Sequence, residues 1–232
     1  MDASNLNLID YSKFFNQKNF IACISLRDKN YAINDNRNEF ISKLELDHSV
    51  FKFPDQTHSK NVKIVNESNL YLDTDGVIST SPKFGLGILI ADCLPIFLYN
   101  INTNHFGLIH SGWRGSANKI TSVALNKMIE KGSNPEDIKA VIGPSIGKCC
   151  FEIGKEVSEL FETQYMEPIV GSKFRLDLKD FLHKELISKG LIEKNLLIDP
   201  HCTFCEKNKF FSHRREGQTA GRMMAIMGWK NK

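Results

Sequence analysis

The stretch GLGILIADCLPIFLYNINTNHFGLIHSGWRG, Gly85–Gly115, decides how this chain is organised. It contains apolar runs typical of buried strands, and reactive residues follow two of them: Asp92-Cys93 and then His110. Polar or nucleophilic residues at strand ends are typical of active sites, whereas a core strand needs neither a thiol nor an imidazole there. We therefore predict that Cys93 and His110 meet in space and, with His58, hold a metal ion.

These three residues allow more than one interpretation. Catalytic zinc uses three protein ligands and keeps a fourth position open, which suits one thiolate and two imidazoles. The same atoms also fit a metal-free cysteine hydrolase or deamidase, with Cys93 as nucleophile and His110 as base. A small buried thiol beside two hydrogen-bonded histidines would have no function at all. Dispersed cysteines and histidines have no diagnostic spacing, so all three interpretations stay open at this point.

Composition limits the class of protein. The 232 residues can bury roughly 70–75% of their unfolded surface, so the core needs no disulfides. A net charge of +3 and scattered lysines argue against a nucleic-acid partner, and no apolar run approaches the roughly 20 residues of a membrane span. The N-terminus lacks the features of a secretory signal, so we expect a cytoplasmic protein whose six cysteines are thiols, metal ligands or redox groups. Nothing demands a dimer, and we expect a monomer.

Hydrophobic periodicity predicts strands mixed with helices. Strands are expected over residues 20–26 and 62–65, and helices over residues 36–46, 116–131 and 154–165, with a further helix capped by Asp177. The elements do not alternate strictly, and no linker or repeat divides the chain. We therefore predict a single α+β domain over residues 1–232 rather than a doubly wound sheet.

Other motifs carry weaker signals. Cys202-x-x-Cys205 could be half of a structural zinc site or a redox pair, with His201 or one of the adjacent Cys149-Cys150 as further ligands. Adjacent cysteines chelate awkwardly, so two partly buried thiols that shape a loop are the simpler interpretation. Arg114, Arg214 and Arg215 could clamp a phosphate.

The motifs around the residues named above resemble those of the YfiH/YlmD-type laccase-domain family, which is often named multicopper polyphenol oxidoreductase or purine nucleoside phosphorylase. The resemblance runs from about Phe51 to Trp229. It rests on several motifs in the same order: Gln56-x-His58, Asp75-Gly76, Ala91-Asp-Cys-Leu-Pro95, His110-Ser-Gly-Trp-Arg-Gly115, the stretch Ile142–Gly154, Cys202-Thr-Phe-Cys205 and Phe211-Ser-His-Arg-Arg215.

The resemblance implies a zinc-dependent enzyme. His58, Cys93 and His110 would bind the catalytic zinc, and the substrates would be purine nucleosides and phosphate: adenosine, inosine and methylthioadenosine for phosphorolysis, and adenosine for deamination. The implied fold is a layered sandwich of mixed β-sheets covered by helices, similar to cysteine-dependent toxin deamidases.

Further roles can be assigned within this scheme. Arg27, Arg114 and Arg215 are candidates for phosphate contact. Asp92 is a candidate to support the metal ligands, and Asp75 or Glu152 could act as general acid or base.

The name laccase can be tested on the sequence. A multicopper oxidase needs many histidines in His-x-His pairs and a separate copper site, whereas this chain has seven histidines and no such pair. Multicopper electron transfer is therefore rejected. Polyphenol oxidation by adventitious copper at the same three ligands remains an alternative, as does a binding module whose zinc is structural.

Two features depart from the family pattern. The loop after Arg27 is shorter than usual, and serine and histidine stand at Ser111 and His213 where alanine and tyrosine are usual. The change at His213 is expected to alter the substrate pocket.

Overall fold

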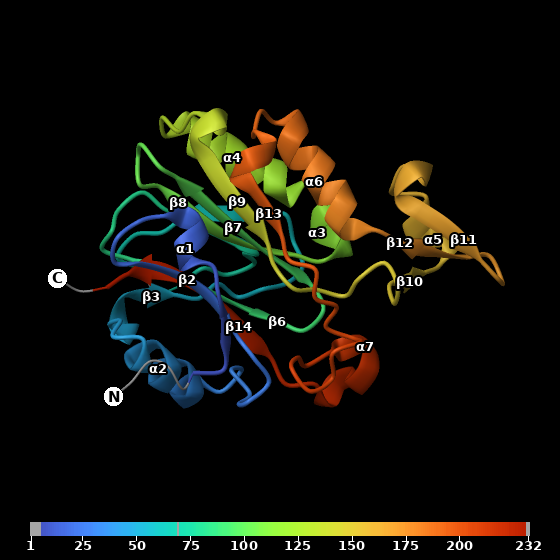
Figure 1. The fold of residues 1–232 in the computed structure, drawn as a ribbon, viewed down its shortest axis with the longest axis horizontal. Helices are drawn as coiled ribbons and strands as arrows, with labels where there is room; N and C mark the ends of the chain where they lie inside the picture. The colour runs from blue at the N-terminus through green and yellow to red at the C-terminus, as the bar shows by residue number, and fades with distance from the viewer. Residues whose placement is uncertain (1–5, 69, 231–232) are drawn as a thin grey trace.

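Two β-sheets packed face to face form the centre of the molecule in the computed structural model, which describes residues 6–68 and 70–230 (Figure 1). Among these residues, one sheet has five strands in the spatial order β1 (Leu8–Asp10), β2 (Phe20–Ser25), β14 (Met223–Trp229), β6 (Gly85–Ile90) and β3 (Phe51–Lys52). The other has six, in the order β13 (Leu196–Ile198), β9 (Ile138–Ile142), β7 (Leu94–Asn100), β8 (Phe106–Ser111), β5 (Gly76–Ser79) and β4 (Val62–Ile64). Both sheets mix parallel and antiparallel pairs.

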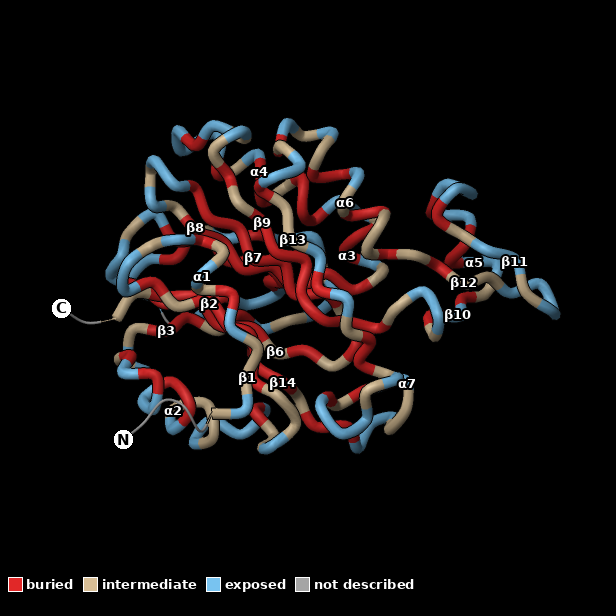
Figure 2. Tube along the Cα trace, in the orientation of Figure 1, coloured by how far each residue is buried: buried red, intermediate tan, exposed pale blue. Residues whose placement is uncertain are grey.

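The strand β7 shows why the sheets stack. All its residues are buried, and successive side chains point to opposite faces. Leu94, Ile96 and Leu98 pack toward helices, whereas Phe97 and Tyr99 pack between the two sheets. Figure 2 shows the resulting concentration of buried residues in the strands. A strand that is apolar on both faces therefore requires a layer on each side.

Helices supply the two outer layers. The helix α2 (Asn34–Lys43) covers the five-stranded sheet through Phe40 and Ile41. The helices α4 (Ile120–Glu130) and α6 (Leu178–Ser188) cover the six-stranded sheet, and the Asp177 side chain caps α6 by accepting a hydrogen bond from the Asp180 N–H (3.1 Å). The shorter helices are α1 (Ser12–Phe15), α3 (Trp113–Ala117), α5 (Lys155–Ser158) and α7 (His213–Glu216). The predicted α+β fold of mixed sheets covered by helices is confirmed.

A small sheet lies beside this four-layer body. It consists of β10 (Glu152–Ile153), β12 (Lys173–Leu176) and β11 (Met166–Ile169), and it projects to the right of the molecule in Figure 1 together with α5. Among the described residues, no helix combines the length and apolar character that a membrane span requires.

Two predicted helices differ from the structure. The helix expected over residues 116–131 is divided into α3 and α4, because Lys119 adopts a left-handed conformation (φ 61°) between them. A helix is also expected over residues 154–165, but the helix α5 ends at Ser158, so the prediction is wrong beyond that residue. Phe161 and Tyr165 are nevertheless buried, since both rings pack edge-on against Phe181 (centroids 5.1 and 5.2 Å apart). The helical spacing of Phe161 and Tyr165 after Ser158 therefore indicates that these side chains are buried, although the backbone there is not a continuous helix.

The packing of β7 against the helices predicts the cost of a cavity. Leu98→Ala removes a fully buried side chain, so we expect the free energy of unfolding to fall by about 2–5 kcal/mol. The same substitution at Leu160, which is 52% exposed, should change it by less than about 1 kcal/mol. Urea denaturation followed by circular dichroism measures both. Equal effects of the two substitutions would contradict this packing.

Candidate metal centre

Three loops and strand ends bring His58, Cys93 and His110 together. Cys93 lies in the turn that carries the chain from β6 in one sheet to β7 in the other, and His110 lies near the end of β8. Because Pro95 pairs with His110 in the antiparallel register of β7 and β8, the thiol and the imidazole are neighbours. His58 comes from the loop between β3 and β4. The possible ligand atoms of the three residues all lie within 4.8 Å of one another, with Cys93 Sγ 3.7 Å from His58 Nε2.

Gly112 explains part of this close approach. A Cβ atom at this position would lie 2.9 Å from Cys93 Sγ and 3.1 Å from His58 Cδ2. Any side chain would therefore push the cysteine and the histidine apart, which accounts for the glycine that follows His110-Ser111 in the sequence.

The Asp75 carboxylate holds two of the three residues. It is fully buried and accepts hydrogen bonds from the backbone N–H groups of Thr57, His58 and Ser59 (3.1, 3.0 and 2.7 Å) and from the Ser59 hydroxyl (2.8 Å). Its Oδ1 also lies 2.8 Å from His110 Nδ1. Because a carboxylate only accepts, Nδ1 carries the proton and Nε2 is left with a lone pair for a metal ion.

Contacts within the site shift the pKa values of Asp75, Cys93 and His110. Burial opposes ionisation of Asp75, but hydrogen bonds from His110 and Ser59 outweigh it and lower the pKa to about 2. Burial likewise raises the pKa of Cys93, yet His110 and His58 outweigh it and lower that pKa to about 6. For His110, burial lowers the pKa, whereas Cys93 and Asp75 raise it to about 9. Without a metal, Cys93 and His110 therefore form a thiolate–imidazolium pair at neutral pH.

A cavity of about 630 Å³ opens in front of these residues. This volume lies within the roughly 300–1,000 Å³ range of small-molecule sites. Its lining combines aromatic and aliphatic side chains with cationic ones and with the carboxylates Asp55 and Asp92. Besides His58, Cys93 and His110, it includes Trp113, Phe151, Ile146, Leu94, Leu178, Arg114, His213, Arg214 and Arg222.

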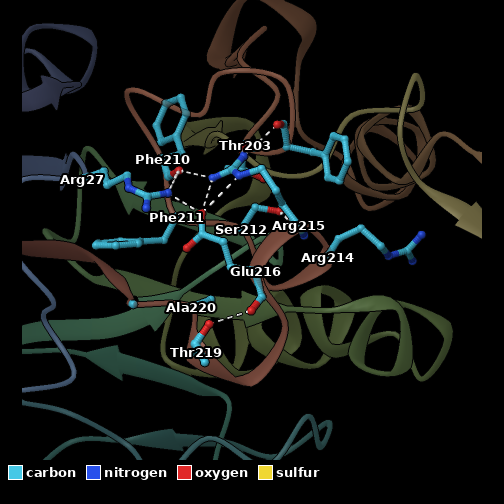
Figure 3. Close-up of polar contacts among 12 residues, drawn as sticks. Arg27, Thr203, Phe210, Phe211, Ser212, Arg214, Arg215, Glu216, Thr219 and Ala220 are labelled. Atoms are coloured by element: carbon cyan, nitrogen blue, oxygen red, sulfur yellow. Dashed lines mark hydrogen bonds and ion pairs between the residues drawn. The ribbon is translucent and has the colours of Figure 1, made fainter.

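The three arginines predicted to contact phosphate separate in the structure. Arg114 lines the cavity, and its guanidinium stacks on the Trp113 ring, with Cζ 4.2 Å from the ring centroid. Arg27 and Arg215 line a different, shallower depression. There Arg215 donates to the carbonyl oxygens of Thr203, Phe204 and Phe210 (2.8, 2.7 and 2.6 Å), and both arginines pair with Glu216 (Figure 3). Arg27 and Arg215 therefore hold the C-terminal loop together.

Asp92 lines the cavity, but its carboxylate is hydrogen-bonded to later loops, and Glu152 does not line the cavity. Asp92 is buried with φ 82°, and it accepts hydrogen bonds from Thr203 Oγ1 (2.6 Å), Ser212 Oγ (2.9 Å) and the Arg214 N–H (2.7 Å). It thereby fastens the turn that carries Cys93 to two later loops. Glu152 is exposed on β10 and is absent from the lining of the cavity, to which only its neighbour Phe151 contributes.

The sequence model of the family described as multi-copper polyphenol oxidoreductase laccase matches residues 12–230. The chain belongs to this family. Within residues 6–68 and 70–230, the groups of His and Cys residues able to hold a metal are the His58–Cys93–His110 trio and one cluster of four cysteines. Neither resembles the linked copper sites that the family description suggests.

Two relatives of the chain carry names from nucleoside metabolism. The chain is 30% identical over 224 residues to purine nucleoside phosphorylase YlmD of Bacillus subtilis, covering 89% of this chain and 81% of that protein. It is 30% identical over 218 residues to adenosine deaminase RL5 from an unknown prokaryotic organism, covering 86% of this chain and 83% of that protein. The solved structure of the hypothetical protein YfiH from Bacillus licheniformis superposes with a TM-score of 0.91 at 26% identity, covering 99% of this chain and 98% of the other.

Sequence reasoning missed how the site is supported. The donors from Thr57 and Ser59 to Asp75, and those from Thr203 and Ser212 to Asp92, join residues that are far apart in the chain. Single serines and threonines give no signal in one sequence. The positive φ angles of Asp92 and of His58 (62°) are likewise visible only in the structure.

The thiolate–imidazolium pair predicts a pH profile. In metal-stripped protein, alkylation of Cys93 by iodoacetamide should rise with a midpoint near pH 6, because the thiolate forms as the pH passes that value. Asp75→Asn should move the midpoint upward, since it removes the carboxylate that favours the His110 cation. Peptide mass spectrometry resolves Cys93 from the other cysteines. A midpoint near the ordinary value of 9.0 in the unaltered chain would contradict the pairing.

Proposed function

We propose that this chain is a metal-dependent enzyme of purine nucleosides, which catalyses phosphorolysis of adenosine, inosine and methylthioadenosine and deamination of adenosine. The observation that carries the proposal is the convergence of His58, Cys93 and His110 at a cavity of nucleoside-accommodating size. The names of the relatives, purine nucleoside phosphorylase and adenosine deaminase, support the same substrate class.

The donor set fits zinc. Two imidazoles and one thiolate are ligands that Zn²⁺ accepts, and three protein ligands leave a position open to the cavity. Copper also binds such ligands, and metal analysis distinguishes the two. A bound Zn²⁺ would supply Lewis acidity and lower the pKa of water to about 7.

The residues around the trio have defined tasks in this proposal. Asp75 keeps the proton on His110 Nδ1, so Nε2 faces the other two ligands. A carboxylate with a pKa of about 2 that accepts this many hydrogen bonds is a positioning group and not a proton shuttle at neutral pH. We therefore assign Asp75 to ligand orientation rather than to the acid–base role considered from the sequence.

The cavity lining suits a nucleoside and a phosphate. Trp113 and Phe151 offer flat apolar surface on which a purine could stack. Arg114, Arg214 and His213 line the cavity and can supply donors, and the two arginines are suited to bidentate contact with phosphate oxygens. His213 lines the same cavity, so we propose that it adjusts substrate preference.

A second candidate is a metal-free cysteine hydrolase. The observation in its favour is the Cys93–His110 ion pair, because a thiolate beside an imidazolium is a competent nucleophile. The two functions differ in their response to metal removal.

Adenosine tests the main proposal. The purified chain should release adenine from adenosine in a phosphate-dependent reaction and also form inosine, both measured by liquid chromatography. Cys93→Ala should reduce both to background, whereas the matched substitution Cys23→Ala, in a different part of the core, should retain them. Stripping the metal should abolish activity, and added Zn²⁺ should restore it. Full deamination of adenosine by the stripped protein would support the cysteine hydrolase, and no adenine release by the unaltered chain would refute phosphorolysis.

Arg114 gives a sharper test of the phosphate site. Loss of a charge-assisted hydrogen bond costs about 1.5–3 kcal/mol, so Arg114→Ala should raise the KM for phosphate by about 10- to 100-fold. Arg27→Ala is the control, because Arg27 lies outside the cavity. The KM for phosphate in this control should stay within about threefold of the original value once folding is verified. The opposite pattern would return the phosphate site to Arg27.

A further inference from the structure

A second cluster of possible metal ligands lies away from the His58–Cys93–His110 trio. It consists of Cys149, Cys150, Cys202 and Cys205, whose sulfur atoms all lie within 4.8 Å of one another. Cys149 and Cys150 belong to the loop between β9 and β10, and the other two follow β13. All four are free thiols.

Two of the sulfur separations are close to those of a tetrahedral thiolate site. With a Zn–S bond of about 2.3 Å, the edges of a regular tetrahedron of sulfurs measure about 3.8 Å. Cys205 Sγ lies 3.7 Å from Cys149 Sγ and 3.3 Å from Cys150 Sγ. The Cys202-x-x-Cys205 spacing is also that of paired ligands in structural zinc sites.

The backbone explains how two adjacent cysteines reach one centre. The N–H groups of Cys150 and Phe151 both donate to the Gly147 carbonyl (2.9 Å each), which winds the loop into a tight turn. Both sulfurs then approach Cys205. Adjacent cysteines usually chelate one ion awkwardly, but this turn lets Cys149 and Cys150 approach the same centre.

Gly147 also brings the second loop close. Its N–H donates to Cys202 Sγ (3.2 Å), and a Cβ atom at Gly147 would lie 3.3 Å from both Cys149 Sγ and Cys202 Cβ. A parallel bridge between Ser145 and Cys202 and the hydrogen bond from the Thr203 N–H to the Ser145 carbonyl (3.0 Å) fix the two loops side by side. The four thiols are thus held on a supported framework.

His201, the other ligand considered from the sequence, is engaged elsewhere. Its Nδ1 lies 2.7 Å from Asp199 Oδ1, and its Nε2 lies 3.8 Å from Glu206 Oε2. The cluster is therefore composed of cysteines alone.

We propose that Cys149, Cys150, Cys202 and Cys205 bind a structural Zn²⁺ ion, separate from the metal at His58, Cys93 and His110. Four thiolates close the coordination sphere, so this ion has no open position for substrate. It cross-links the loop that carries Ile146 and Phe151, two residues of the cavity wall, to the loop that carries Thr203, the partner of Asp92. Its role is to fix that wall, and it is independent of whether the substrate is a nucleoside.

The number of bound metal ions tests this site. The full chain with His58→Ala and Cys93→Ser lacks the first centre, and after purification under reducing conditions it should retain one zinc per chain by mass spectrometry of metals. Adding Cys202→Ser and Cys205→Ser should reduce this to zero, whereas adding Cys23→Ala, at a buried cysteine outside both clusters, should leave one. Absence of zinc from the His58→Ala/Cys93→Ser chain would overturn the proposal, and iron in its place would overturn the assignment to zinc.

A second measurement does not depend on the folding of the fourfold variant. Co²⁺ added to chelator-treated His58→Ala/Cys93→Ser protein should bind one equivalent and give the thiolate-to-cobalt charge-transfer and intense visible bands of a tetrahedral sulfur site. Zn²⁺ should displace it and raise the Tm, because the ion binds the folded chain. No cobalt bands from fully reduced protein, or a Tm unchanged by Zn²⁺, would overturn the proposal. Failure of the adenosine assay alone would leave this site unaffected.

Discussion

The carboxylate of Asp75 is the group on which the arrangement of the candidate metal ligands depends. Taking an ionised carboxylate out of water is costly unless hydrogen-bond donors replace the water, and here the donors are the Thr57–Ser59 backbone, the Ser59 hydroxyl and His110. The carboxylate can be buried only when the loop with His58 and the strand with His110 are both folded around it. The two imidazoles are therefore positioned relative to each other by the protein, before any metal binds.

The sequence allowed the strand ends to be predicted but not their support. Cys93 and His110 follow apolar runs, and neighbouring antiparallel strands bring such ends together. His58 lies in an irregular loop held by contacts distant in sequence, so it was identified only as a ligand type and through the family motif. The sequence makes Arg27 and Arg215 candidates for phosphate contact, because an arginine has the same signature whether it binds an anion or, as these two do in the structure, carbonyl oxygens and Glu216. Apolar residues after Ser158 have the spacing of a helix, but the segment is irregular, and its side chains Phe161 and Tyr165 are buried without one.

Asp92 connects the two groups of possible metal ligands. It directly precedes Cys93, and its carboxylate is hydrogen-bonded to Thr203, the residue after Cys202. The buried Asp92 carboxylate therefore lies between the loop with Cys202 and the turn with Cys93. One buried side chain therefore links the loops of the two clusters, although the clusters share no ligand.

The small sheet of β10, β12 and β11 begins and ends at nearly the same place. The Leu176 N–H donates to the Phe151 carbonyl (3.0 Å), so the chain leaves the main body and returns to it at adjacent points. Val170, at the far hairpin of this excursion, is 94% exposed. A loop whose ends are already held together tolerates added length with little entropic cost. The hairpin around Val170 is therefore a natural graft point, at which a fluorescent or affinity module could be inserted without disturbing either cluster of ligands.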